Sequence, residues 1–207
     1  MSKSTDPAMY DSGFERLEGE RYFTDAWMTE VLMRHLDVAD IPGVLWEPAA
    51  GRGDMVRVLQ DYCADVFASD IDMSEFDTAL CPHMEHDFIE GDFCPELEGI
   101  GAIITNPPFR DLAPKFLEKA LSYKSVRFVA MLLPTEFPSA KTTRRMELFT
   151  KQPFAYEIKM VDRPRWDWWF REPEKGEGTP RKVFSWFVWD REWRGPCTIF
   201  WERRERC

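Results

Sequence analysis

The chain has 207 residues and a formal net charge of −10, which argues against a protein that coats nucleic acid indiscriminately. A chain of this length buries roughly 70% of its unfolded surface as one domain, so folding requires no disulfide, metal or partner. Its apolar runs are far shorter than the roughly 20 residues of a membrane helix. Because the first ten residues are polar and the five cysteines are odd in number and scattered, we expect reduced thiols and a cytoplasmic location.

The first half of the chain predicts a strand, a glycine loop and a helix. Residues 1–20 read as a mobile polar arm, and a helix is expected over about 26–36, with Thr24 or Asp25 as its cap. A short strand over 43–46 leads into the loop Glu47-Pro-Ala-Ala-Gly-Arg-Gly-Asp54, and a helix follows over about 55–63. A glycine turn in this place lets the backbone and the helix N-terminus approach a ligand closely, although a purely structural turn remains an alternative.

Acidic residues follow the next two predicted strands. The strand over 65–69 ends in Asp70-Ile71-Asp72, some 20 residues after the glycine loop, where an acid can take the two hydroxyls of a ribose. A third strand end is expected within residues 87–93, where Asp92 can accept from an adenine amino group while Phe93 packs on the ring. Taken alone, that acid could equally be an exposed residue after an edge strand.

The stretch Ile103-Ile104-Thr105-Asn106-Pro107-Pro108-Phe109 predicts a buried strand that ends in a stiff loop. Two consecutive prolines fix two φ angles and remove two backbone donors, which leaves the carbonyls of Asn106 and Pro107 free to accept. An asparagine oxygen and a nearby carbonyl can together hold both hydrogens of one NH2 group, with an aromatic face beside them. This arrangement suits an exocyclic amine or a primary amide.

The second half predicts a helix over about 113–123, a strand over 126–133 and a β-hairpin with strands over 154–161 and 182–189. Strands that alternate with helices, with polar residues at the strand ends, predict an α/β doubly wound sheet that binds its ligand along one edge. The hairpin loop over 162–182 is rich in tryptophan and arginine, which is the composition that stacks and clamps bases. These tryptophans could equally pack beneath a long loop.

These motifs, in this order and spacing over residues 21–189, resemble those of the S-adenosylmethionine-dependent amino-methyltransferases, specifically the DNA adenine-N6 type. The resemblance implies a Rossmann-like class I methyltransferase, here a single domain over 1–207, with a mostly parallel sheet and an antiparallel C-terminal hairpin. It implies S-adenosylmethionine as cofactor and DNA as partner. The implied reaction methylates the N6 amino group of adenine in a flipped-out base.

The resemblance also assigns roles by position. The cofactor residues are Phe23, Thr24, Glu47, Pro48, Ala49, Gly51, Gly53, Asp70, Ile71, Asp92 and Phe93. The catalytic residues are Asn106, Pro107, Pro108 and Phe109, and Phe109 stacks on the extruded base. The substrate residues are Arg163, Arg165, Trp166, Trp168 and Trp169.

The chain departs from the restriction-type enzymes because it has no room for a separate target-recognition region. It is similar to small stand-alone enzymes of phages and mobile elements, and it could read a short site, act with a specificity partner or be promiscuous. The target sequence and the oligomeric state stay open.

Several alternatives remain at this stage. The same two acceptors would orient an adenine of RNA or a glutamine amide of a protein, and a non-catalytic cofactor-binding subunit would keep the same fold. The residues Cys81, His83, His86 and Cys94 could offer zinc ligands, but their spacing fits no standard zinc pattern, so no metal is expected.

Overall fold

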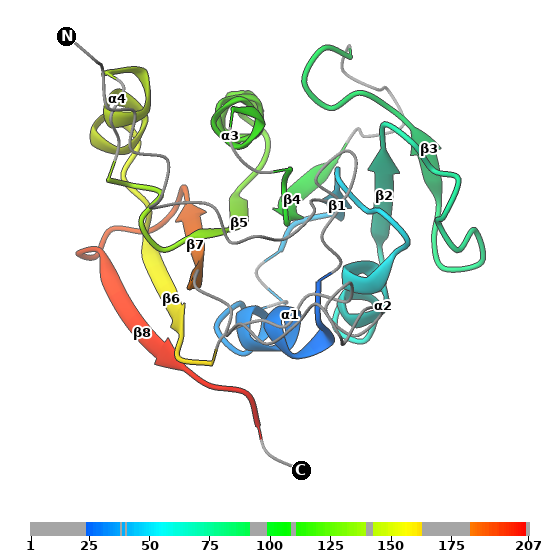
Figure 1. Ribbon diagram of the computed structural model, residues 1–207, viewed down its shortest axis with the longest axis horizontal. Coiled ribbons are helices and arrows are strands. Elements are labelled where there is room, and N and C mark those ends of the chain that lie inside the picture. The colour runs from blue at the N-terminus through cyan, green and yellow to red at the C-terminus, as the bar shows by residue number, and fades with distance from the viewer. Residues whose placement is uncertain are drawn as a thin grey trace, which may run out of the picture.

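The computed structural model describes most of the chain from Thr24 onward (Figure 1). The described residues are 24–37, 39, 41–91, 99–108, 111–139, 143–162 and 183–205. The expected arm over 1–20 lies outside these ranges, as does the expected loop over 162–182 apart from Asp162. Within the described part of the chain, no helix is long and apolar enough to cross a membrane.

The described residues form eight strands and four helices. The strands are β1 (Val44–Glu47), β2 (Val66–Asp70), β3 (His83–Glu85), β4 (Ile100–Thr105), β5 (Phe128–Pro134), β6 (Tyr156–Met160), β7 (Phe184–Asp190) and β8 (Thr198–Glu202). The helices are α1 (Ala26–Met33), α2 (Asp54–Gln60), α3 (Leu112–Ser122) and α4 (Thr143–Lys151).

All eight strands belong to one sheet with the order β3-β2-β1-β4-β5-β7-β6-β8. Strand β7 runs antiparallel to both of its neighbours, β5 and β6. The remaining neighbouring pairs are parallel. The predicted fold class, a mostly parallel α/β sheet with an antiparallel C-terminal hairpin, is therefore confirmed.

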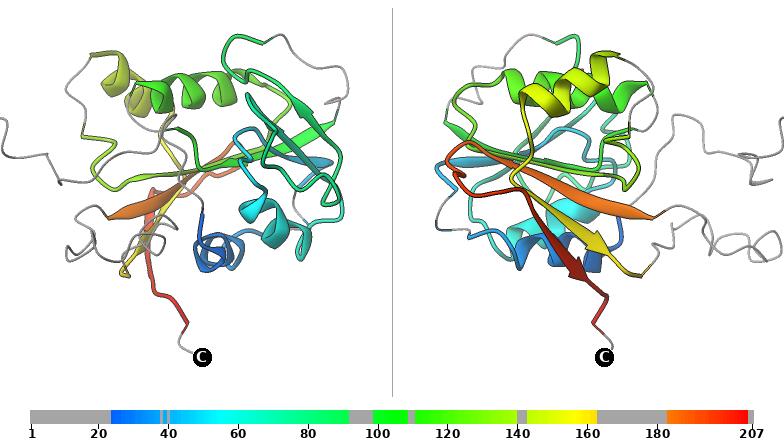
Figure 2. Two further views of the ribbon diagram at one scale, coloured as in Figure 1. Left: turned by 45° about the vertical axis from the view of Figure 1, so that its right-hand side comes forward. Right: turned by 90° about the vertical axis from the view of Figure 1, so that its left-hand side faces the viewer.

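The helices cover both faces of the sheet, with α1 and α2 on one face and α3 and α4 on the other (Figure 2). The central strand β5 is apolar throughout because both of its faces are buried. Its residues Ala130 and Leu132 pack in the core on the α1 and α2 side, whereas Val129 and Met131 pack in the core on the α3 side. Because β1 pairs in parallel with both β2 and β4, the carboxyl ends of these three strands lie at one edge of the sheet.

Two elements were not predicted from the sequence. Helix α4 precedes β6, and strand β8 adds a parallel partner at the outer edge of β6. Helix α1 is also shorter than expected, because residues 34–36 form a turn instead of a further helical turn. Asp25 occupies the N-cap position of α1 but makes no side-chain capping bond.

Helix α1 is anchored to the sheet from the far end of the chain. The indole of the fully buried Trp186 on β7 donates from Nε1 to the carbonyl oxygen of Met28 at 2.7 Å. At the other end of the helix, Arg34 Nη1 donates to Glu205 at 2.7 Å, and the ring of His35 lies 2.9 Å from Glu202 on β8. The position of α1 therefore depends on the C-terminal strands.

We predict that Trp186→Phe lowers the free energy of unfolding by about 2 kcal/mol, because it removes this buried bond and leaves a cavity. The matched control is Trp201→Phe on β8, where the side chain is 69% exposed and the change should stay within about 0.5 kcal/mol. Urea unfolding followed by far-UV circular dichroism measures both values. Equal losses for the two variants would contradict the anchoring role.

Candidate active site

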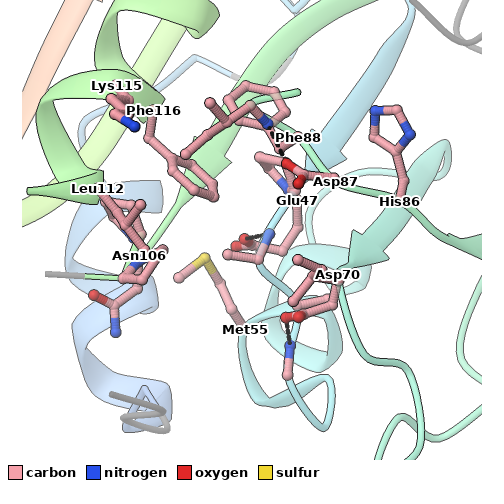
Figure 3. Close-up of a pocket in the computed structure, with 18 of the residues that line it drawn as sticks. Glu47, Met55, Asp70, His86, Asp87, Phe88, Asn106, Leu112, Lys115 and Phe116 are labelled. Carbon is pink, nitrogen blue, oxygen red and sulfur yellow. Dashed lines mark hydrogen bonds between the residues drawn. The ribbon is translucent and has the colours of Figure 1, made fainter. Parts of the chain in front are cut away.

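A pocket of about 400 Å³ lies at the edge of the sheet where β1, β2, β3 and β4 end (Figure 3). Its wall is built from the loops after these strands, from Thr24 before α1 and from the first turns of α3. The lining residues that the sequence analysis named are Thr24, Glu47, Pro48, Ala49, Gly51, Asp70, Ile71, Asn106, Pro107 and Pro108. Segments up to 92 positions apart in the chain, from Thr24 to Phe116, thus meet in one place.

Glu47 ends β1 in the floor of the pocket, and its side chain is 1% exposed. Its Oε1 accepts from Thr105 Oγ1 at 2.6 Å and from the amide of Ala49 at 2.9 Å. Its Oε2 is buried and has no hydrogen-bond partner among the described residues. Burial raises the pKa of Glu47 to about 8, against the two hydrogen bonds, and the nearby Asp70 adds to the rise. The pocket floor therefore holds a carboxyl group with one unsatisfied oxygen.

The glycine loop follows Glu47 and bends through two left-handed residues, Gly51 with φ 52° and Gly53 with φ 91°. Gly51 lines the pocket, but Gly53 does not. Gly53 is instead the N-cap of α2, and a Cβ there would lie 2.5 Å from Leu80 Cδ1. Its positive φ and this close packing explain the glycine without any contact to a ligand.

Asp70 ends β2 on the side of the pocket opposite Asn106 in the view of Figure 3. Its Oδ2 accepts from the amide of Gly51 at 2.8 Å, and its Oδ1 accepts from the amide of Asp72 at 3.3 Å. The carboxylate is thus held by the backbone of two loops. Beside it, Ile71 lines the pocket while 66% of its surface is exposed.

The third strand end differs from the prediction. Strand β3 covers only His83–Glu85, and the loop after it brings His86, Asp87, Phe88, Ile89 and Glu90 to the pocket. The predicted residues Asp92 and Phe93 lie outside the described residues. The sequence carried a signal for the observed contact, because the dipeptide Asp-Phe occurs at 87–88 and again at 92–93.

The loop after β3 is held from within and from α3. Asp87 Oδ1 accepts from the amides of Ile89 and Glu90 at 2.9 and 3.0 Å. Lys119 of α3 donates from Nζ to the carbonyls of Ile89 and Gly91 at 3.3 and 3.0 Å. Phe88 is 2% exposed and packs its ring 4.9 Å from that of Phe116, centroid to centroid. The loop is therefore fixed to the helix that follows β4.

Asn106 and the two prolines follow the buried end of β4. Asn106 Nδ2 donates to Thr24 Oγ1 at 3.0 Å, and Thr24 is 7% exposed. Pro107 and Pro108 line the pocket beside them, and Phe109 lies outside the described residues.

Further lining residues were missed by sequence reasoning. They are Ala50, Asp54, Met55, Leu112, Lys115 and Phe116, in addition to the loop after β3. In Figure 3, Met55 lies between Asn106 and Asp70, and Leu112, Lys115 and Phe116 project from the start of α3. The amphipathic pattern that follows the Pro-Pro stretch predicted the helix but not which of its side chains face the pocket.

The predicted substrate residues are all outside the described part of the chain. They are Arg163, Arg165, Trp166, Trp168 and Trp169. Phe23, expected beside the cofactor, also lies outside it. Among the described residues, no group of three or more His, Cys, Asp or Glu side chains is arranged to hold a metal ion.

Comparison with known proteins gives fold relatives only. No family model and no curated protein matches this chain. Solved structures that match include a modification subunit of a putative type I restriction enzyme from Vibrio vulnificus, with a TM-score of 0.56 and 12% identity over 88% of this chain and 47% of that chain. A putative RNA methyltransferase from Pyrococcus horikoshii matches with a TM-score of 0.57 and 18% identity, over 86% of this chain and 89% of that one. A dimethyladenosine transferase from Plasmodium falciparum matches with a TM-score of 0.58 and 15% identity, over 82% of this chain and 63% of that one.

At these identities the comparisons establish a shared Rossmann-like methyltransferase fold. The chain spans about half the length of the Vibrio vulnificus modification subunit.

The buried carboxyl of Glu47 predicts a pH-dependent stability in the absence of ligand. Its pKa is about 8 in the folded chain against 4.5 for the unperturbed group, so the folded state keeps a proton that the unfolded state releases. The stabilisation is complete below the unfolded pKa and is lost as the pH rises toward 8. Relative to Glu47→Gln, the wild type should therefore lose stability between pH 5 and pH 8.

Urea unfolding of both proteins at several pH values measures this difference. Glu85→Gln, at an exposed carboxyl of β3, is the control and should give curves parallel to those of the wild type. A gap between wild type and Glu47→Gln that stays constant from pH 5 to pH 8 would contradict the buried, protonated carboxyl.

Proposed function

We propose that this chain transfers a methyl group from S-adenosylmethionine to the N6 amino group of adenine in DNA. The observation that carries the proposal is that one pocket is lined both by the acids Glu47 and Asp70 and by Asn106, Pro107 and Pro108. When bound, the cofactor supplies an electrophilic methyl group on a sulfonium. The amino nitrogen would form the new N–C bond while the C–S bond breaks with its electron pair remaining on sulfur, and the nitrogen would release one proton to water.

The residues present fit this cofactor. Its nucleoside and amino-acid parts carry hydroxyls and cationic groups, and the pocket offers acceptors for both. Asp70 presents a backbone-held carboxylate for the ribose hydroxyls. The buried Oε2 of Glu47 has no hydrogen-bond partner among the described residues, which is costly. It becomes an acceptor for a cationic group once Glu47 gives up its proton on binding. Ile71, Phe88 and Phe116 supply apolar surface for a flat ring.

Asn106 and Pro107 are the proposed orienting groups for the substrate. An aromatic amine is a poor nucleophile because its lone pair is delocalised into the ring. Hydrogen bonds from both N6 hydrogens to Asn106 Oδ1 and to the carbonyl of Pro107 favour a pyramidal nitrogen whose lone pair faces the methyl group. Phe109 is the proposed stacking partner of the extruded base.

The choice of DNA as substrate rests on the motif at the end of β4. The solved structures that share the fold include both a modification subunit of a putative type I restriction enzyme and a putative RNA methyltransferase. DNA is favoured by the resemblance of the Asn106-Pro107-Pro108-Phe109 motif to the DNA adenine-N6 enzymes. The proposal also includes a separate protein partner that reads the target sequence, since the match to this chain covers only 47% of the modification subunit.

The test is transfer of radiolabelled methyl from S-adenosylmethionine to unmethylated DNA, total RNA and a cell protein extract, followed by digestion of the labelled pool. We expect label in DNA, recovered as N6-methyladenine. Label only in RNA or in protein would keep the chemistry and replace the substrate. Label in no pool would contradict the proposal for the isolated chain.

Asn106→Ala should lower the methyl-transfer rate by about 100-fold or more, because it removes one of the two acceptors that orient the amine. Gln152→Ala truncates an exposed side-chain amide after α4 and serves as the control, with an unchanged rate. Equal labelling by Asn106→Ala and wild type would exclude Asn106 from catalysis.

A further inference from the structure

Thr24 contacts Asn106 across 82 positions of sequence. The resemblance to methyltransferases places Thr24 beside the cofactor, yet the bond that it makes here is to the proposed catalytic amide. Its Oγ1 accepts from Asn106 Nδ2 at 3.0 Å, and only 7% of Thr24 is exposed. The contact is therefore largely shielded from water, where a hydrogen bond fixes geometry more firmly than at the surface.

Thr24 is itself held in place because it immediately precedes α1. The helix begins two residues later, and the amide of Met28 donates to the carbonyl of Asp25 at 2.9 Å. Met28 in turn accepts from Trp186 of β7 at 2.7 Å. A short path of hydrogen bonds and helical backbone thus connects the hydroxyl of Thr24 to the sheet, as the position of α1 beneath the strands in Figure 1 illustrates.

The side-chain amide of asparagine has a donor end and an acceptor end that exchange places on rotation about χ2. If the NH2 end faced a substrate amine, two donors would oppose each other and the nitrogen would not be oriented. An acceptor beside Nδ2 favours the opposite rotamer, in which Oδ1 is presented to the amine. Thr24 Oγ1 is such an acceptor.

We propose that Thr24 is a positioning residue, whose hydroxyl oxygen holds Nδ2 of Asn106 so that Oδ1 accepts from the substrate amino group. The inference rests on the proposed methyl transfer and deepens it. It predicts that Thr24 acts on the chemical step through Asn106, and that the cofactor is held by other residues of the pocket.

The kinetic test compares wild type, Thr24→Val and Thr24→Ser in the full chain. Valine keeps the shape of threonine without an acceptor, so kcat at saturating cofactor and DNA should fall by about 10- to 100-fold. The dissociation constant of S-adenosylmethionine, measured by calorimetry, should stay within about twofold. Serine keeps the hydroxyl and should restore most of the rate. Thr198→Val on β8, far from the pocket, is the matched control and should leave the rate unchanged.

A second readout does not depend on turnover. Asn106 is the single asparagine of the sequence, so protein labelled with side-chain ¹⁵N-asparagine gives one NH2 pair in an NMR spectrum. In the ligand-free protein, Thr24→Val should shift this pair and speed its hydrogen exchange, because Nδ2 loses the hydrogen bond to Thr24 Oγ1. Thr24→Ser should retain the wild-type pattern.

The outcomes separate the two claims. An unchanged kcat or an unchanged NH2 signal in Thr24→Val would overturn the positioning role while an active wild type keeps the proposed function. A Thr24→Val defect that lies only in cofactor affinity and disappears at saturation would also overturn it, since Thr24 would then be a cofactor contact. A wild type that transfers no methyl group fails the proposed function, and the positioning role fails with it.

Discussion

The carboxyl group of Glu47 connects the two central strands of the site, and the remaining geometry depends on that connection. One oxygen accepts from Thr105 at the end of β4 and from Ala49 in the glycine loop, so the loops after β1 and β4 start from a common point. The glycine loop then reaches Asp70 through the amide of Gly51, which fixes the end of β2. A single buried acid therefore sets the relative positions of the proposed cofactor side and the proposed substrate side.

The burial of Glu47 also has an energetic cost. It raises the pKa of the carboxyl group and leaves Oε2 without a hydrogen-bond partner among the described residues. A cationic ligand in the pocket would offset this cost.

The two faces of the sheet supply the rest of the pocket from elements distant in sequence. On one face, α1 is tied to β7 and to the C-terminal strand β8, and it delivers Thr24 to Asn106. On the other face, α3 holds the loop after β3 through Lys119 and buries Phe88 against Phe116. The pocket is therefore preformed by packing and hydrogen bonds within the chain. Preformed sites lower the cost of orienting a ligand and a reacting group.

The sequence predicted the fold class and most strands because the central strands are continuous apolar runs that end in glycine, acidic or proline residues. It predicted the hairpin of β6 and β7 for the same reason.

The sequence did not predict β8, because the strand Thr198–Glu202 is short and half exposed and is ordered by its pairing with β6. It placed the third strand within residues 87–93, whereas β3 covers His83–Glu85 and Phe88 lies in the loop after it, where it packs against Phe116. The roles assigned to Asp92 and Phe93 stay predictions, because both residues lie outside the described part of the chain. Gly53, which the sequence analysis assigned to the cofactor, does not line the pocket, and the side chains of Leu80 and Phe76 lie beside it; its contact with the cofactor stays a prediction. The bond between Thr24 and Asn106 has no local sequence signal, because it joins residues that only the completed sheet brings together.

The central claim is that this pocket binds S-adenosylmethionine through the acid at the end of β2, and calorimetric titration of the ligand-free chain tests it most directly. Asp70→Asn keeps an acceptor for the amide of Gly51 but removes the charge, and Asp77→Asn changes an exposed acid that pairs with Arg57 outside the pocket. We expect one cofactor bound per wild-type chain, binding at least about tenfold weaker in Asp70→Asn, and wild-type affinity in Asp77→Asn. No binding by the wild type, or equal affinity of the wild type and Asp70→Asn, would contradict it.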